Sequence, residues 1–394
     1  MRHDRQVELL QRVADGGPRL TGLFGEHSAV QPASAYTDEE RFAREVRIMF
    51  REGPTFLGLS CECAEEGSYL TATLGKVPVV VVRQPDASLR GFVNACRHRG
   101  APLFEPGRGT IKGRIACGYH AWTYETDGRL AARPMSDGAF DDVSLNCDLH
   151  PVPVAEKHGM IFVRAGGGAP VDADAFLDRA GDDLGAFGLE NYTLIGSRTA
   201  TWKMNWKLIL DTFTESYHIR WLHKDSLAPT FLSDCTIFEA FGKNLLSVGL
   251  RKSVFEEFDK PVEEWSLLPY GTIQYFLVPN GLVVYQLDHV ESWRIEPIDV
   301  RTTRVVTSLH SPQPPATEKA HRYFTKNLDL LLQVTGTEDF PLMEKIQANL
   351  DSGALPEVVY GRVEPPLVYF HQSVNRILAE AADAAEVVDR GHGL

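Results

Sequence analysis

The chain has 394 residues, of which 43% are hydrophobic and 24% charged, and it carries a formal net charge of −13. This length and apolar content favour two sizeable folded domains and exclude a collagenous, coiled-coil or largely disordered chain. The acidic balance argues against nucleic-acid binding, which needs concentrated Lys and Arg, so a small molecule or a partner protein is the expected ligand.

The N-terminus carries charges of both signs and leads into a helical pattern instead of the apolar core of a secretion signal. The most apolar run, 77–82, contains Pro78 and is far too short to cross a bilayer. We therefore expect a cytoplasmic protein without a membrane segment. In that compartment the six cysteines are candidates for metal ligation or redox chemistry before disulfides.

The first predicted element is a helix over 38–50, where apolar residues recur at helical spacing behind Thr37 as the candidate N-cap. From Phe56 to about Val163, short β-branched and aromatic runs alternate with Gly, Pro and Asp turns, which predicts a small all-β domain. Its expected strands cover 69–74, 77–82, 89–94, 112–116 and 159–163. The Gly-rich segment 165–170 is the candidate linker.

Helical and strand-like patterns are mixed after this linker, which predicts an α+β domain. The expected helices cover 205–218, 319–333 and 342–350, and the expected strands cover 245–250 and 281–287. The expected division of the chain is an N-terminal helical segment at 1–52 that packs on the second domain, an all-β domain at 53–164 and an α+β domain at 165–394.

Two short motifs in the β domain carry metal-ligand chemistry. Cys96 and His98 form C-x-H, Cys117 and His120 form C-x-x-H, and 18 residues separate the two motifs. Two thiolates and two imidazoles suit either tetrahedral zinc or a [2Fe–2S] cluster with both Cys on one iron and both His on the other. The single residue between Cys96 and His98 favours iron, because zinc motifs usually separate paired ligands by about two to four residues.

The flanking residues, Cys-x-His-Arg-Gly and Cys-x-x-His-x-Trp, resemble the Rieske family, although the spacing between the motifs lies at the long end for its oxygenases. The resemblance implies four cluster ligands: Cys96, His98, Cys117 and His120. It also implies that the two His form an exposed edge through which electrons leave. The remaining cysteines are expected to be structural: Cys61, Cys63, Cys147 and Cys235. Trp122 is expected to pack beneath the cluster.

A second motif lies in the predicted helix over 205–218 and just beyond it. Glu215, His218 and His223 form E-x-x-H-x-x-x-x-H. Glu215 and His218 share one face of a continuous helix, whereas His223 does not, so the helix should end or bend near Trp221 for both imidazoles to reach one ion. By itself, the pattern also fits an amphipathic helix with two ordinary His.

With the first motif present, the Asn-Trp-Lys lead-in at 205–207 and the second motif resemble the α (catalytic) subunits of Rieske non-haem iron ring-hydroxylating oxygenases. The resemblance then covers both domains and implies an N-terminal Rieske domain followed by a catalytic domain with an antiparallel sheet flanked by helices. It also implies a mononuclear Fe(II) held by His218, His223 and one carboxylate.

The third iron ligand is expected to be Asp339, which matches the family's late Glu-Asp segment before a helix. Glu338 and Asp288 are the alternatives. The resemblance gives Glu215 a different role, as a bridge that hydrogen-bonds an iron ligand and a cluster ligand of the neighbouring subunit. This role implies a homotrimer, with or without a small β subunit.

The function that the resemblance implies is the terminal oxygenase of a multicomponent system. Electrons from NAD(P)H arrive through a reductase, with or without a ferredoxin, and O2 activated at Fe(II) hydroxylates, cis-dihydroxylates or oxidatively demethylates an aromatic or other small apolar substrate. One alternative is a non-enzymatic Rieske electron-transfer protein fused to a binding domain, which requires only the first motif. Another is a structural zinc module on an unrelated enzyme.

Overall fold

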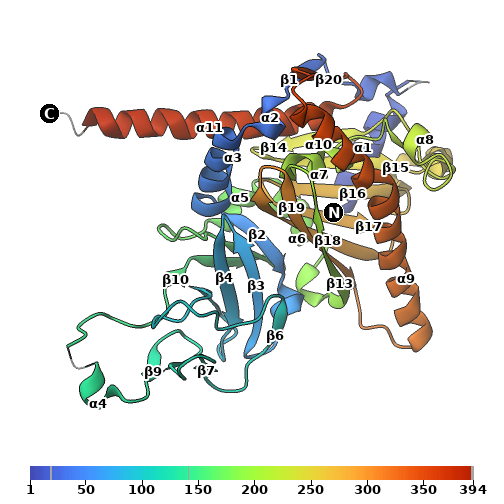
Figure 1. The fold of residues 1–394 in the computed structure, drawn as a ribbon. Helices are drawn as coiled ribbons and strands as arrows, with labels where there is room; N and C mark the ends of the chain where they lie inside the picture. Colours follow the sequence, from blue (N-terminus) through green and yellow to red (C-terminus); the bar gives the residue numbers. More distant parts are fainter. Residues whose placement is uncertain (18–19, 141, 392–394) are drawn as a thin grey trace.

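The computed structural model describes residues 1–17, 20–140 and 142–391. Figure 1 shows a small β domain at one end of the molecule and a larger domain built around a long antiparallel sheet at the other. The predicted architecture, an all-β domain followed by an α+β domain with an antiparallel sheet flanked by helices, is confirmed. The predicted linker at 165–170 contains no helix or strand.

The small β domain consists of three antiparallel sheets. The five-stranded sheet has the order β10 (Pro151–Val152), β5 (Leu89–Val93), β4 (Val77–Arg83), β3 (Ser68–Leu74) and β6 (Arg108–Thr110). The two three-stranded sheets contain β11 (Val154–Lys157), β12 (Met160–Val163) and β2 (Thr55–Leu59), and β7 (Ile115–Ala116), β8 (Thr123–Tyr124) and β9 (Leu130–Ala132). The expected strands are confirmed except the one over 112–116, which is shortened to the two residues of β7.

The hairpin between β3 and β4 shows why the sequence folds this way locally. Leu74 pairs with Val77, and the two residues between them, Gly75 and Lys76, have φ values of +54° and +67°. Both values match a two-residue hairpin turn whose twist suits the flanking strands. A Cβ atom at position 75 would lie 2.6 Å from Cβ of Arg51, so only glycine fits at this position of the turn.

The larger domain is built on a seven-stranded antiparallel sheet. Its order is β13 (Thr193–Trp202), β19 (Thr302–Ser311), β18 (His289–Asp299), β17 (Gly281–Gln286), β16 (Gly271–Leu277), β15 (Asn244–Leu250) and β14 (Ile237–Phe241). The predicted strands over 245–250 and 281–287 are confirmed as β15 and β17.

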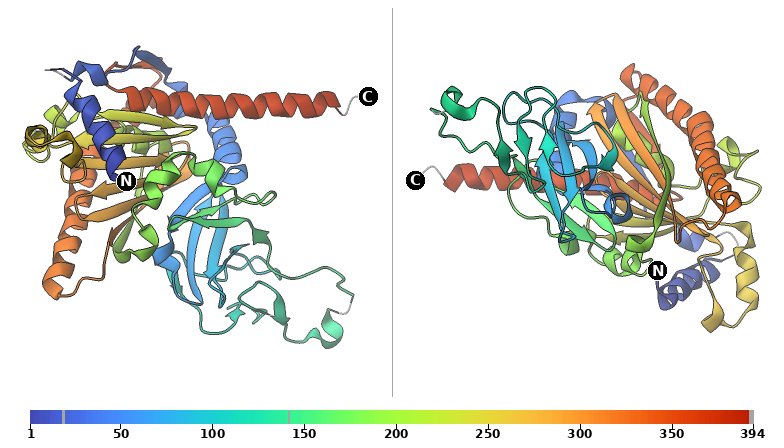
Figure 2. Two further views of the ribbon diagram at one scale, coloured as in Figure 1. Left: turned by 180° about the vertical axis from the view of Figure 1, so that it is seen from behind. Right: turned by 90° about the horizontal axis from the view of Figure 1, so that it is seen from below.

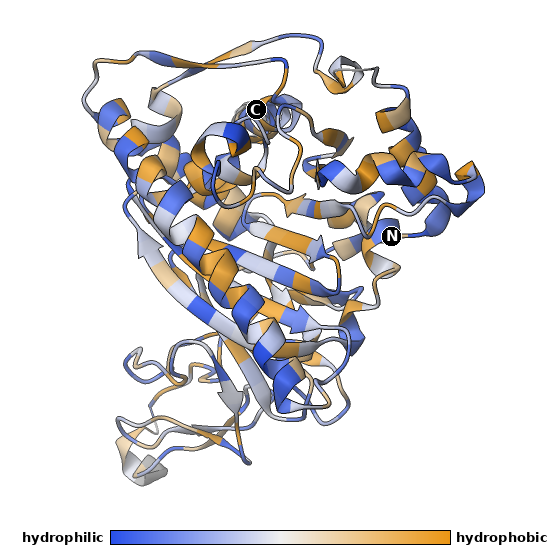
Figure 3. Ribbon diagram, turned by 90° about the vertical axis from the view of Figure 1, so that its right-hand side faces the viewer, coloured by the Kyte–Doolittle hydropathy of each residue, from blue (hydrophilic) through white to orange (hydrophobic). Residues whose placement is uncertain are grey.

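Helices pack on both faces of this sheet, and its central strands are largely buried, whereas the edge strand β13 is partly exposed. The helices on one face are α7 (Trp206–Phe213), α9 (Glu318–Val334), α10 (Phe340–Asp351) and α11 (Pro365–Gly391), while α1 (His3–Ala14), α5 (Ala173–Leu177) and α6 (Ala180–Gly185) pack on the other. We call the first of these the helix-facing side; Figure 3 shows α9 running diagonally across it. The predicted helices over 319–333 and 342–350 are confirmed as α9 and α10.

The N-terminal and C-terminal segments lie together on the larger domain. A two-stranded sheet joins β1 (Ala29–Pro32) to β20 (Glu357–Tyr360), and α2 (Ser34–Thr37) and α3 (Glu39–Glu45) follow β1. The predicted helix over 38–50 is α3 continued by a π-helix, Val46–Glu52. The N-cap prediction was wrong: Thr37 ends α2, and the side chain of Asp38 accepts the Arg41 N–H instead.

The second half of α11 extends away from the body of the molecule (Figure 2). Within the described ranges, none of the helices has both the length and the apolar character that a membrane crossing requires.

Candidate active site

The two predicted cluster loops are tight turns at the tip of the small β domain. In the first, the Cys96 N–H donates to Ala101 O at 2.8 Å and the Gly100 N–H donates to Cys96 O at 2.8 Å. In the second, the Cys117 N–H donates to Trp122 O at 2.8 Å and the Ala121 N–H donates to Cys117 O at 3.0 Å. Each turn is therefore closed by its own backbone, and each presents its His a few residues after its Cys.

The four predicted cluster residues lie together, with the thiols inside and the imidazoles outside. Cys96 and Cys117 are 3% and 4% exposed, whereas His98 is half-buried and His120 is exposed. The ring centroids of the two His are 4.6 Å apart. Trp122 is buried and stacks on His98 at 5.0 Å with an interplanar angle of 7°, so it supports this histidine from below.

The donor set fits a binuclear cluster better than a single metal ion. One tetrahedral zinc requires all four donor atoms to converge on one point. Of the residues that the structure describes, only His218, His223 and Asp339 bring three such atoms within 4.8 Å of one another. The four loop residues do not meet this criterion, and two Cys with two His is the donor set of a Rieske [2Fe–2S] cluster.

Tyr124 belongs to the cluster site although the sequence motifs did not identify it. Its hydroxyl lies 3.2 Å from Sγ of Cys96 and accepts the Arg97 N–H at 3.0 Å. With that N–H donating to its oxygen, the hydroxyl is free to donate its own hydrogen to the sulfur. Tyrosine is common in strands, so nothing in the sequence separated Tyr124 of β8 from an ordinary core residue.

The remaining cysteines are free thiols at structural positions. Cys63 is fully buried in the core of the small β domain, and Cys147 and Cys235 are 8% and 2% exposed. Burial raises the pKa of the Cys61 and Cys235 thiols to about 12, so neither offers a thiolate at neutral pH.

The second site begins where α7 ends. The predicted helix over 205–218 stops at Phe213, so the expectation that Glu215 and His218 share a helix face was wrong. The hydroxyl of Thr214 donates to Asp211 O at 2.9 Å, and that of Ser216 donates to Cys235 O at 2.7 Å. Such side-chain bonds to backbone carbonyls favour a turn over a continued helix.

A short helix, α8 (Ile219–Leu222), follows this turn and sets the positions of both predicted His ligands. His218 is its N-cap and His223, with φ −98° and ψ 29°, lies just beyond its end. The chain therefore bends before His218, and α8 ends at Leu222, next to Trp221, where an end or bend was predicted. The ring centroids of the two His are consequently only 5.0 Å apart.

The predicted third ligand comes from the helical hairpin of α9 and α10. Asp339 ends a π-helix, Thr335–Asp339, between these two helices, and Pro341 lies in the first turn of α10. Its Oδ1 is 2.9 Å from Nε2 of His223 and 3.6 Å from Nε2 of His218. Single π-turns within longer helices are frequent at functional sites, because the extra residue turns one side chain out of register.

Three observations show that these residues fit a metal ion. Asp339 is 4% exposed, and its Oδ1 has no hydrogen-bond donor in the described part of the chain. The other ring nitrogen of His223, Nδ1, lies 2.9 Å from Oε2 of Glu338, so an Nδ1–H leaves Nε2 with a lone pair that faces Oδ1. Two His and one carboxylate on one side of an ion is the donor set of non-haem Fe(II).

The two alternatives for the third ligand lie elsewhere. Glu338 contacts the outer nitrogen of His223, and its Oε2 also accepts the Ser226 hydroxyl at 2.9 Å. Burial lowers the pKa of His223, but Asp339 and Glu338 together outweigh burial and raise it above its ordinary value. Asp288 is half-exposed and contacts His289 at 2.9 Å, outside the cluster.

Glu215 contacts His218 through both carboxylate oxygens. One accepts the backbone N–H of His218 at 3.0 Å, and the other contacts Nδ1 of the same residue. Glu215 thus lies at the start of α8 and holds His218 from the side away from Asp339. Figure 1 shows β7 and β9, in the sheet that carries the second cluster loop, at the opposite end of the molecule from α8.

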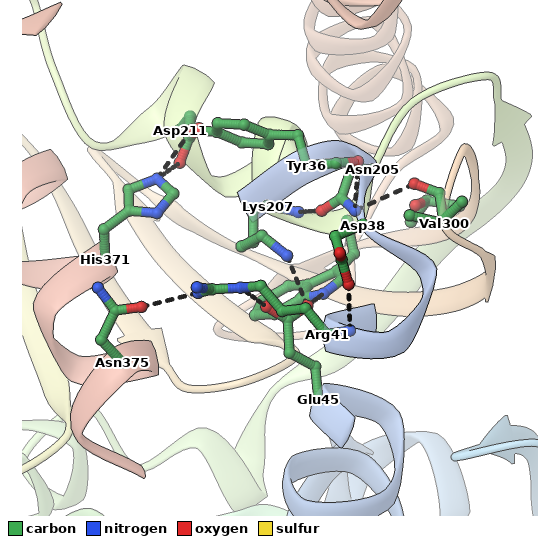
Figure 4. A network of polar contacts seen from close by, with 12 residues as sticks. Tyr36, Asp38, Arg41, Glu45, Asn205, Lys207, Asp211, Val300, His371 and Asn375 are labelled. Atoms are coloured by element: carbon green, nitrogen blue, oxygen red, sulfur yellow. Dashed lines mark hydrogen bonds and ion pairs between the residues drawn. The ribbon is translucent and has the colours of Figure 1, made fainter. Parts of the chain in front are cut away.

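Two buried polar networks fix α7, the helix that leads to Glu215 (Figure 4). Glu45 of α3 accepts hydrogen bonds from Lys207 Nζ at 2.5 Å, Trp206 Nε1 at 2.9 Å and Arg41 Nε at 2.9 Å. Both Lys207 and Glu45 are fully buried, and breaking such a pair costs about 3–5 kcal/mol.

The second network is centred on Asp211, at the other end of α7. Its carboxylate accepts the Tyr36 hydroxyl at 2.6 Å and lies 2.9 Å from Nε2 of His371 on α11. The N-terminal and C-terminal segments of the chain therefore both hold α7 in place.

Comparisons with known proteins agree with this geometry. The family described as "Rieske [2Fe-2S] domain" matches residues 54–153, and the family described as "Ring hydroxylating alpha subunit (catalytic domain)" matches residues 189–380. The chain belongs to the family of Rieske oxygenase α-subunits. The cofactors of this family are a Rieske [2Fe–2S] cluster and a mononuclear iron.

Curated relatives match over part of their length. The oxygenase subunit of glycine betaine monooxygenase from Chromohalobacter salexigens is 34% identical over 203 residues, which are 52% of this chain and 44% of that protein. The large oxygenase component of naphthalene 1,2-dioxygenase from Pseudomonas aeruginosa is 34% identical over 216 residues, 52% of this chain and 47% of that protein. The matched stretch thus spans less than half of these relatives.

Solved structures share the fold over most of the chain. The quaternary ammonium Rieske monooxygenase CntA in complex with L-carnitine has a TM-score of 0.76 at 22% identity and covers 88% of this chain and 95% of its own. Naphthalene 1,2-dioxygenase from Rhodococcus sp. has a TM-score of 0.72 at 18% identity, and the match covers 96% of this chain and 99% of that structure's chain.

Proposed function

We propose that this chain is the terminal oxygenase component of a multicomponent Rieske oxygenase, which hydroxylates or oxidatively demethylates a small organic substrate with O2. The observation that supports this proposal best is the convergence of His218, His223 and Asp339, whose donor atoms lie within 4.8 Å of one another. An electron-transfer protein needs only the cluster loops, so this second donor set favours the oxygenase over that alternative.

Each predicted site residue then has a role that its position supports. Cys96, His98, Cys117 and His120 hold the [2Fe–2S] cluster, and His218, His223 and Asp339 hold the mononuclear iron. When bound, the cluster supplies single electrons and the iron activates O2 beside the substrate. His218, His223 and Asp339 would hold the iron with two imidazoles and one carboxylate, the donor set of non-haem Fe(II) oxygenases. Glu338 orients His223 through its Nδ1–H.

The separation of the two sites within one chain supports a role for Glu215 between subunits. We infer that Glu215 links His218 to a cluster His of a neighbouring subunit in a cytoplasmic homotrimer, with or without a β subunit. A reductase, with or without a ferredoxin, supplies electrons from NAD(P)H. The proposed division of the chain is the N-terminal segment 1–52, the Rieske domain 53–164 and the catalytic domain 165–394.

The first test is the iron and acid-labile sulfide content of anaerobically purified protein, with the EPR spectrum after reduction. We expect about three irons and two sulfides per chain and a Rieske signal. About two irons that added Fe(II) does not increase would leave only an electron-transfer protein. A colourless protein that contains zinc would refute both readings.

The role of Glu215 is tested by Glu215→Gln, with the exposed Glu380→Gln as the control. We expect both variants to keep their cluster and iron, and only Glu215→Gln to lose steady-state oxygenation, by about 10- to 100-fold. Full activity of Glu215→Gln would remove the bridge from the proposal while leaving the oxygenase assignment intact.

A further inference from the structure

The helix-facing side of the large sheet changes from apolar to polar along its strands, where Ser247 and Glu291 are buried and Gln274 is half-buried. One cross-strand row is apolar up to Trp293: Leu245, Phe276, Leu282 and Trp293. The next row on the same side contains three polar residues, Ser247, Gln274 and Glu291. Its other members are Phe238, Val284 and Leu309. Polar side chains on a buried sheet face require a polar partner opposite them.

This polar row lies next to the predicted iron ligands. Trp293, one row away, has its ring centroid 4.9 Å from that of Phe213 at the end of α7 and 6.4 Å from that of Phe340, the residue after Asp339. The chain that follows His223 closes over the same end of the sheet, where the Leu232 N–H donates to Leu250 O at 2.8 Å.

The third border of the row is α9, the helix that leads to Asp339. The ring of His289, in the following row of the sheet, lies 6.4 Å from that of Phe324 on α9. The elements that carry all three predicted iron ligands thus surround the polar row.

Glu291 differs from the other buried glutamates of the described chain. Glu45 pairs with Lys207, Glu257 with Lys260, and Glu296 with Arg294 and Arg304. Glu291 is 2% exposed and has no ion pair with Lys or Arg among the described residues. A buried carboxylate is unfavourable without a compensating charge, and a protonated His289, which Glu291 shares with Asp288, compensates only one of these two carboxylates.

The contacts that Glu291 does make are long. Trp293 Nε1 donates to one oxygen at 3.3 Å, and Gln286 Nε2 donates to the other at 3.5 Å. His289 Nε2 lies 3.7 Å from Glu291, and its Nδ1 lies 2.9 Å from Asp288. Burial lowers the pKa of His289, but Glu291 and Asp288 together outweigh burial and raise it, so one imidazole serves two carboxylates. Arg251, the nearby guanidinium, donates to Gln286 at 3.4 Å and forms no contact with Glu291 within the described residues.

Gln274 gives an independent sign of a missing ligand in the same row. Its Oε1 is buried and has no hydrogen-bond donor among the described residues. Gln274 and Glu291 are two strands apart on the same side, about 10 Å across the sheet. A ligand with donor groups or a positive charge would satisfy both.

We propose that Glu291 selects a small organic cation, an N-methylated or protonated amine, as the substrate of the proposed oxygenase. The carboxylate supplies the opposite charge, and the aromatic side chains beside it, Trp293 and Phe213, accept N-methyl groups against their rings. This inference rests on the proposed function, because it places the cation beside the iron ligands. The expectation of an aromatic or small apolar substrate leaves Glu291 without a role.

The test compares ligands that carry a quaternary nitrogen with ligands of the same shape that carry a carbon atom in its place. Choline, a cation, is paired with its uncharged carbon isostere, 3,3-dimethylbutan-1-ol. Glycine betaine, a zwitterion, is paired with its anionic carbon isostere, 3,3-dimethylbutanoate, so each pair differs by the one positive charge of the nitrogen. Binding to the anaerobic holoprotein is measured by calorimetry, without reductant, so that no turnover occurs. We expect at least one quaternary compound to bind about tenfold or more tightly than its isostere.

Variants then assign this preference to Glu291. Glu291→Gln keeps the shape and removes the charge, and we expect it to lose the preference for the cation. The matched control is Glu296→Gln, the same change on the same strand at a residue that pairs with Arg294 and Arg304; it should keep the preference. An unchanged preference in Glu291→Gln would overturn the inference.

The comparison on the unmodified protein needs no variant to fold. If neither quaternary compound binds more tightly than its isostere, the inference fails, whatever the iron content. A holoprotein with about three irons but no charge preference would refute this inference alone. A chain without the third iron that still prefers the cation through Glu291 would refute the proposed oxygenase while leaving the cation site in place.

Discussion

The two metal-ligand clusters of this chain are built in opposite ways. Each cluster loop places a Cys and a His within one turn, and backbone hydrogen bonds of that turn hold them. The predicted iron site joins residues from two distant segments, and Asp339 comes from a π-turn between two helices. The first site is local and half-exposed, whereas the second depends on packing around it.

This difference teaches where each site is vulnerable. The loops need few long-range partners, because turn geometry alone presents their ligands. The iron site needs α7, α8 and the α9–α10 hairpin in fixed positions, so buried supports such as Glu45 with Lys207 and Asp211 with His371 hold its elements. Substitutions should therefore affect the two sites separately.

The largest effect is expected for Cys117→Ser. Loss of a thiolate ligand should remove the whole cluster, about two of the three irons, and abolish oxygenation, while the mononuclear iron remains. Iron and sulfide analysis with EPR measures this. Cys147→Ser, at a buried thiol outside the site, is the matched control and should keep the cluster. Loss of the mononuclear iron as well would show that the two sites are not independent.

Asp339→Ala should do the reverse. The variant keeps the cluster signal but loses the mononuclear iron and oxygenation, because two imidazoles alone bind Fe(II) weakly. Asp288→Ala, at the alternative carboxylate, should behave like the unmodified protein in the same assays. If Asp288→Ala lost the iron and Asp339→Ala retained it, the ligand assignment would be wrong.

A smaller effect is expected for Glu338→Gln, which alters the residue that holds His223 without touching the ion. Residues in this outer position typically change metal affinity by about 10- to 100-fold. The rate of Fe(II) loss to a chelator measures the change, and Glu344→Gln on α10 serves as the control. Complete loss of iron, equal to that of Asp339→Ala, would make Glu338 a ligand.

The smallest effect is expected for Tyr124→Phe, which tests the local site in the same way. A hydroxyl that donates to Sγ of Cys96 stabilises the reduced cluster, which is the more negative state. Its removal should therefore lower the reduction potential by an amount equivalent to about 1–2 kcal/mol of free energy. A potentiometric titration followed by EPR measures this shift. The exposed Tyr119→Phe is the control, and an unchanged potential in Tyr124→Phe would contradict the contact.

Much of the fold was predictable because its signals are local. The hairpin of β3 and β4 follows from Gly75 and from alternating β-branched runs, and α9 and α10 follow from helical spacing. The continuation of α7 to His218 was predicted wrongly, because the Ser216 hydroxyl bonds Cys235 O, nineteen residues further along the chain, and this contact depends on the folded chain. Helical periodicity contains no information about such contacts.

The sequence by itself determined the candidate ligands, because the short Cys-His and Glu-His-His motifs are patterns of neighbouring residues. Only the tertiary structure decided how those residues meet. It placed Asp339 against both His, gave Glu338 the outer nitrogen of His223, brought Tyr124 to Cys96 and buried Glu291 without a Lys or Arg partner. The physical reason is that burial and charge compensation are set by side chains far apart in the chain, which become neighbours only when the sheet and helices pack.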